Sequence, residues 1–134
     1  MPSKKTKNQK RPQLQEDLAT RVEQLTTLLN CLEKELQEID SSGEVAPPGC
    51  WIVRYQAKGR NETYWYYKLH ATQEIFSTRT EGKMSQYKHL GKAGSQAYLN
   101  GVIHVLRRSQ IDGLNRAIQT LKSGLVDLTD EGTR

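Results

Sequence analysis

The sequence has no apolar run longer than a few residues. Only 35% of its 134 residues are hydrophobic, whereas a helix that crosses a bilayer needs about 20 apolar residues in succession. No apolar stretch follows the basic N-terminus, so we expect no secretory signal. We therefore expect a small soluble cytoplasmic protein without a membrane partner.

Cysteine is also scarce, because the sequence contains only two cysteines, Cys31 and Cys50. Two thiols cannot build a disulfide scaffold, and with three scattered histidines they lack the spacing of a structural zinc site. We expect no metal site and no cofactor.

The sequence lacks a nucleophile, a base and an orienting group at the spacing of a catalytic motif. Residues 91–95 have the composition of a phosphate loop, but Lys92 does not follow a second glycine at P-loop spacing. We therefore predict a protein that is not an enzyme and has no catalytic residues.

Charge is present but strongly segregated along the chain. Residues 1–13 hold five bases and no acid, and residues 14–44 hold eight acids and two bases. Residues 51–122 hold twelve bases and four acids, and all nine aromatic residues lie between Trp51 and Tyr98. Cations interleaved with flat rings are what a nucleic-acid surface needs.

The N-terminal part of the chain predicts a tail and a long helix. Residues 1–12 are polar and lysine-rich, which indicates a disordered basic tail, and a helix is expected over residues 13–41. A linker with Pro47 and Pro48 follows over residues 42–50. The apolar residues of the helix keep heptad spacing, and they are Leu18, Val22, Leu25, Leu29, Leu32, Leu36 and Ile39.

From Trp51 the hydrophobic period becomes two, which is typical of strands. We expect a three- or four-stranded antiparallel sheet over residues 51–92, built from one hairpin about Gly59 and a second pair, residues 74–79 with 84–90. The apolar face is predicted to carry Trp51, Val53, Tyr55, Trp65, Tyr67 and Leu69. The polar face is predicted to carry Arg54, Gln56, Lys58, Tyr64, Tyr66, Lys68 and His70.

A second helix is expected over residues 94–128, with Ser95 as its N-cap, a kink near residues 109–113 and a tail over residues 129–134. From Ile111 it shows the same heptad spacing as the first helix. One apolar stripe does not offset the conformational entropy of a long helix, so each helix needs a partner. The two helices either pack antiparallel in one chain, with the sheet projecting from one end, or pair across a homodimer.

The polar sheet face is the predicted contact surface for duplex DNA, because a small sheet can enter the major groove. The predicted nucleic-acid-binding residues are Arg54, Gln56, Lys58, Arg60, Tyr64, Tyr66, Lys68 and His70. Supporting phosphate contacts are predicted at Lys4, Lys5, Lys7, Lys10, Arg11, Arg107 and Arg108.

The string WIVRYQAKGRNETYWYYKLH of residues 51–70, with KHLGKAGSQAY after it, resembles the arm-type DNA-binding domains of tyrosine recombinases. In that family a three-stranded sheet backed by one helix enters the major groove. Over residues 51–108, the resemblance implies that Arg54, Gln56, Tyr66 and Lys68 lie at the groove.

The whole chain is also similar to short proteins of unknown function found among mobile elements of bacteria, including cyanobacteria. Tyr64-Trp65-Tyr66-Tyr67 stands where those proteins have a tyrosine-rich strand. Many of them carry a cysteine cluster before that strand, whereas this chain has only Cys50 there. Both resemblances imply a role in DNA transactions.

Two alternatives remain open at this stage. Tyrosine and tryptophan on an exposed face also suit a protein interface, so the chain could be an adaptor that recruits a larger complex. Stacking on Tyr64 and Tyr66 would instead favour RNA or single-stranded DNA.

Overall fold

The structure is a computed structural model that describes residues 7–133, with side chains from Gln13 onward, and its α+β architecture confirms the predicted fold class. Helix α1 spans Lys7–Ser41 and helix α2 spans Gln96–Gly132. The strands between them are β1 (Trp51–Lys58), β2 (Thr63–His70), β3 (Phe76–Ser77), β4 (Met84–Ser85) and β5 (Tyr87–Gly91).

The chain divides into two compact units, which are described separately. The helical unit combines α1 up to Glu38 with α2 from Asp112 onward. The sheet unit spans Ile39–Ile111, so it holds all five strands and the first part of α2.

Both helices are longer than the sequence pattern predicts. Residues 7–12, expected in a disordered tail, form the first turns of α1, and α2 continues past residue 128 to Gly132. Lysine, glutamine and arginine have high helix propensity, which explains the early start of α1. Residues 109–113, where a kink is predicted, are helical in α2, and one glycine costs only about 1 kcal/mol in a helix. The rest of the expected tail, residues 1–6, lies outside the described residues.

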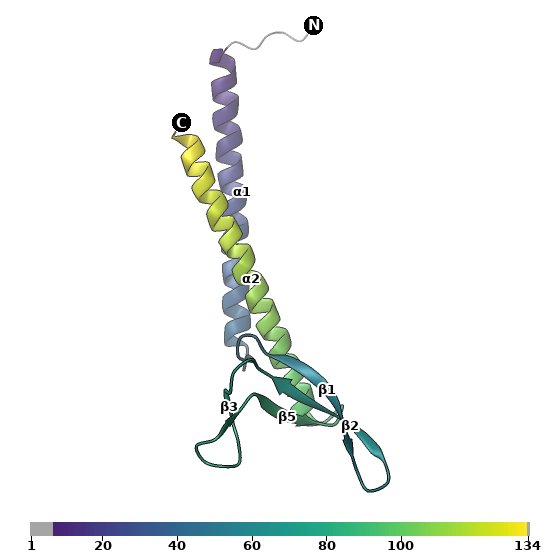
Figure 1. The fold of residues 1–134 in the computed structure, drawn as a ribbon. Helices are drawn as coiled ribbons and strands as arrows, with labels where there is room; N and C mark the ends of the chain where they lie inside the picture. Colours follow the sequence, from purple (N-terminus) through teal and green to yellow (C-terminus); the bar gives the residue numbers. More distant parts are fainter. Residues whose placement is uncertain (1–6, 134) are drawn as a thin grey trace. The chain divides into compact units, whose positions relative to one another are not determined.

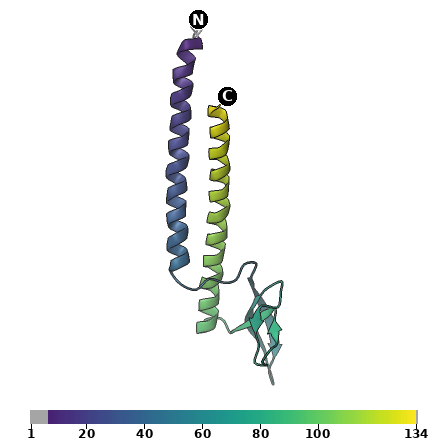
Figure 2. The same ribbon diagram turned by 90° about the vertical axis from the view of Figure 1, so that its left-hand side faces the viewer.

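In the helical unit, α1 and α2 pack antiparallel, as one of the two predicted arrangements requires (Figures 1 and 2). Gly132 faces Leu18 and Gly124 faces Leu25, so residue numbers rise on one helix as they fall on the other. On α2, Ile118 and Leu128 are buried. The heptad residues of α1 are half-buried at most, and Val22 is 38% exposed.

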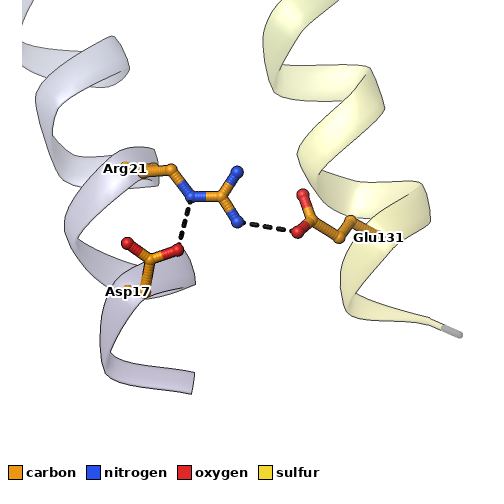
Figure 3. A network of polar contacts seen from close by, with 3 residues as sticks. All are labelled: Asp17, Arg21 and Glu131. Carbon is orange, nitrogen blue, oxygen red and sulfur yellow. Dashed lines mark hydrogen bonds and ion pairs between the residues drawn. The ribbon is translucent and has the colours of Figure 1, made fainter. Parts of the chain in front are cut away.

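Arg21 joins the two helices near their free ends. Its Nη2 donates to Glu131 Oε1 at 2.7 Å, and its Nε lies 3.0 Å from Asp17 Oδ2 (Figure 3). The hydrogen bond to Glu131 raises the pKa of Arg21, and the charges of both carboxylates act in the same direction. All three side chains are open to solvent, so this network adds little stability.

In the sheet unit, β1, β2 and β5 form one antiparallel sheet with β2 in the centre. The β1–β2 hairpin confirms the first predicted pair. The second pair is shorter than expected: β3 and β4 form a separate two-stranded sheet, while β5 joins β2. A turn through Gly82, whose φ of +80° favours glycine, connects β3 to β4.

One face of this sheet packs on the first turns of α2. Leu69 and Leu90 are buried there, and Tyr67 meets Tyr98 of α2 edge to face, with ring centroids 4.8 Å apart. Gly101 leaves room for Leu90, because a Cβ at that position would lie 2.9 Å from Leu90 Cδ1. Ser95 caps the helix as predicted, since its Oγ accepts from the backbone N–H of Tyr98 at 3.2 Å.

Neither helix of the described part of the chain is apolar and long enough to cross a bilayer.

Candidate nucleic-acid interface

The second face of the three-stranded sheet, opposite the one that packs on α2, gathers most of the aromatic rings. Strand register places directly opposite residues on the same face. Trp51 is paired with His70, Val53 with Lys68, and Tyr55 with Tyr66. We call this surface the aromatic face, and its members are Trp51, Val53, Tyr55, Ala57, Tyr64, Tyr66, Lys68, His70, Tyr87 and His89.

A row of three rings crosses the aromatic face from β1 to β5. The ring of His70 lies 4.3 Å from that of Trp51 and 4.5 Å from that of Tyr87, nearly parallel to the latter. Trp51 and Tyr87 are still 41% and 37% exposed. The row therefore forms an ordered, water-facing surface.

Lys68 occupies the middle of the aromatic face. Its Nζ lies 3.9 Å from the ring centroid of Tyr87 and 4.8 Å from that of Tyr55. Lys92, just after β5, is held in the same way, with its Nζ 4.5 Å from the ring centroid of Tyr64. Cation–π contacts thus keep two ammonium groups at this face.

The hydroxyl groups of the tyrosines add polar groups to the same surface. Tyr55 Oη and His89 Nδ1 are 3.0 Å apart and form a hydrogen bond across β2. The ring of Tyr55 also stacks on that of Tyr66, with centroids 6.0 Å apart.

The sheet strands carry positive charge without any negative charge. β1, β2 and β5 contain no aspartate or glutamate, and their bases are Arg54, Lys58, Lys68 and Lys88. A polyanion can therefore approach the aromatic face without meeting a carboxylate on the strands.

The predicted polar face is wrong in part, because its members divide between the two sides of the sheet. Tyr64, Tyr66, Lys68 and His70 lie on the aromatic face, but Arg54 pairs with Tyr67, Gln56 with Trp65 and Lys58 with Thr63 on the other side. The turn between β1 and β2 has four residues, so odd-numbered residues of β1 stand beside even-numbered residues of β2. The prediction instead placed Trp51, Val53 and Tyr55 with Trp65, Tyr67 and Leu69.

The three residues that lie on the other side of the sheet, Arg54, Gln56 and Lys58, are still close together, near the end of the β1–β2 hairpin. β5 pairs only with Tyr67–His70 of β2, so beyond Tyr67 the hairpin continues as a two-stranded ribbon in the described sheet unit. On one side of this ribbon the guanidinium of Arg54 lies 3.5 Å from the ring centroid of Trp65, next to Gln56. Tyr64 and Tyr66 lie on its other side, and Arg60 is in the turn at its tip.

Arg107 and Arg108, predicted to contact phosphate, are engaged elsewhere. Arg107 Nη1 donates to the carbonyl oxygen of Glu44 at 3.1 Å, and Arg108 Nε donates to that of Ala46 at 2.8 Å. Both arginines therefore hold the segment that leads into β1, a role that their positions on a helix do not reveal.

We expect Arg108→Ala to lower stability without changing nucleic-acid affinity. The lost bond joins a charged donor to the carbonyl of a buried alanine, and such bonds contribute about 1.5–3 kcal/mol. Chemical denaturation followed by tryptophan fluorescence would measure the loss, with exposed Arg79 replaced by alanine as the control. An affinity loss at unchanged stability would contradict this structural role.

The predicted phosphate contacts of the N-terminal segment are not described at side-chain level. Lys4 and Lys5 lie outside the described residues, and Lys7, Lys10 and Arg11 are described only by their helical backbone.

Sequence reasoning missed four rings of the aromatic face and the neighbouring Lys92. Trp51 and Tyr55 are predicted on the apolar face, and Tyr87, His89 and Lys92 have no predicted site role. The length of the β1–β2 turn was the available signal for the first two, whereas the other three depend on β5 joining β2.

The described residues contain no group of three or more histidine, cysteine, aspartate or glutamate side chains that could hold a metal ion. Partial burial raises the pKa of the Cys50 thiol, which disfavours the reactive thiolate.

No family model, curated protein or solved structure matches this chain.

Proposed function

We propose that this protein binds duplex DNA through the aromatic face and the adjoining β1–β2 ribbon. The observation that carries the proposal is the convergence of Lys68, Lys92 and seven rings on one open sheet face whose strands lack any acidic residue. Lysine neutralises phosphate and releases counterions, and this release drives most nucleic-acid binding.

The dimensions of the sheet favour the major groove of a duplex. Neighbouring strands lie about 4.8 Å apart, so the axes of three strands span roughly 10 Å, which is close to the groove width of about 12 Å. The ring row also favours a duplex over a single strand. His70 and Tyr87 use their ring faces on each other, and Lys68 lies over Tyr87, so these rings offer edges and hydroxyl groups rather than stacking surfaces for bases.

The ribbon supplies side chains that can read base edges. Arginine and glutamine make bidentate contacts with guanine and adenine, and Arg54 and Gln56 are neighbours on one side of the ribbon. Lys58 and Arg60, at and beyond the end of β1, supply cations that can contact phosphate. The major groove admits a two-stranded ribbon, so both sides of this one can contact DNA.

A salt titration tests the proposal. Four phosphate contacts, from Lys58, Arg60, Lys68 and Lys92, predict that the affinity for a labelled duplex falls about 150-fold between 50 and 200 mM salt. Fluorescence anisotropy measures this fall, and Lys88→Ala is the matched control because Lys88 pairs with Leu69 on the side facing α2.

Three other results would overturn the proposal. Binding that ignores salt would exclude phosphate contacts. Tighter competition by single strands than by the duplex would favour stacking. Absence of binding at micromolar protein would favour a protein adaptor, the alternative that exposed rings also suit.

A further inference from the structure

The helical unit leaves part of its heptad stripe uncovered. An open groove runs along α1 and is lined by α1 residues alone, among them Leu18, Ala19, Val22 and Thr26. Val22 belongs to the heptad stripe but is 38% exposed, although its neighbours Leu18 and Leu25 contact α2. One partner helix therefore covers only part of the apolar surface that this sequence pattern provides.

The two ends of α1 carry opposite charge, and between them Glu16, Asp17 and Glu23 stand against Arg21. Residues 7–11, at one end of the helix, hold three bases and no acid, and residues 33–40, at the other, hold four acids and one base. The point midway between these two segments lies next to Val22, which is also near the middle of the groove.

We infer that this groove binds a second copy of the chain, with the two α1 helices antiparallel about a two-fold axis next to Val22. In this arrangement the basic end of each α1 lies beside the acidic end of the other. A parallel pair would instead place the acidic ends together and the basic ends together. A two-fold contact uses the same patch on both copies, so a groove whose two flanks carry opposite charges is complementary to itself. The small side chains of Ala19 and Thr26 allow the helix axes to approach closely.

Cysteine cross-linking distinguishes this dimer from its alternatives. In a Cys31→Ser/Cys50→Ser background, Val22→Cys should form a disulfide-linked dimer under mild oxidation, because the two-fold axis brings each Val22 next to its copy. Gln15 lines the same groove, and Gln15→Cys should form no disulfide-linked dimer. An antiparallel pair separates the two copies of Gln15 by about 21 Å along the helix axis, beyond the roughly 7 Å between Cα atoms that a disulfide allows.

A measurement of the molar mass in solution, made on protein without engineered cross-links, completes the test. The full chain should be a dimer at micromolar concentration, and Val22→Lys should be a monomer with unchanged helical circular dichroism, because this position is partly exposed. Cross-linking of both cysteine variants would show a parallel pair and overturn the inference. A monomeric mass together with no cross-link at Val22→Cys would also overturn it. DNA binding can be measured on the same variants, since its predicted residues all belong to the sheet unit or the N-terminal segment.

Discussion

Replacing Lys68 and Lys92 together by alanine is expected to weaken duplex binding about 60-fold at 0.1 M salt. Each phosphate contact adds about 0.9 to the slope of log affinity against log salt, which at this concentration is about eightfold per contact. Both ammonium groups lie over tyrosine rings of the aromatic face, so the protein itself holds them in place. The double variant should therefore also lower the salt slope by about 1.8.

The matched control removes the same charge from other surfaces. Lys88 lies on the side of β5 that faces α2, and Lys122 lies on α2 in the helical unit, 3.9 Å from Glu33. We expect Lys88→Ala/Lys122→Ala to keep the salt slope and most of the affinity. Equal losses in the two double variants would mean that net charge alone attracts DNA. Thermal unfolding of each variant checks that the fold survives, because a cation–π contact at an exposed site contributes about 0.5–1 kcal/mol.

The helices were the most predictable part of this fold, because their signal is local. A heptad pattern over Leu18–Ile39 specifies both the helix and its apolar side, and the structure places Leu18 and Leu25 of that side against α2. The ends of α1 and α2 were less predictable. Polar residues of good helix propensity extend a helix without changing its apolar pattern.

The sheet was predictable as a set of strands but not as a set of faces. Alternation tells which residues of one strand share a side, and it does not tell which side of the next strand joins them. In β1 the aliphatic Ile52 stands beside Leu69, which is buried, while Trp51 stands beside His70 on the aromatic face. The prediction puts large aromatic residues on the apolar face, although the core of the sheet unit is aliphatic. Its buried hydrophobic residues are Ala46, Leu69, Ala71, Leu90 and Ile111.

The candidate site depended on long-range pairing that no local pattern encodes. Tyr87 and His89 reach the aromatic face only because β5 pairs with β2, and β3 and β4 intervene in the sequence. The register shift between Tyr67 and Lys68 further changes which residues stand together. The basic and aromatic composition thus predicts a binding surface. Which residues form that surface could be known only from the pairing of the strands.

Leu69→Ala is expected to destabilise the sheet unit by about 2–5 kcal/mol, the usual cost of truncating a buried leucine. Leu69 is 5% exposed at the centre of the sheet, on the side that packs on α2. Leu106→Ala makes the same chemical change at a residue that is 54% exposed, and should alter stability by no more than about 0.5 kcal/mol. Trp51 and Trp65 are the only tryptophans and both lie in the sheet unit, so their fluorescence in urea reports on this unit.

The difference in stability between Leu69→Ala and Leu106→Ala also tests which side of the sheet is open. If α2 covers the side that carries Leu69, the opposite side is the one available to DNA, and Leu69→Ala must cost several times more than Leu106→Ala. A Leu69→Ala cost as small as that of Leu106→Ala would mean that α2 does not cover this side. The aromatic face would then not be the only open side of the sheet. The proposal that Lys68 and the ring row contact DNA would be wrong.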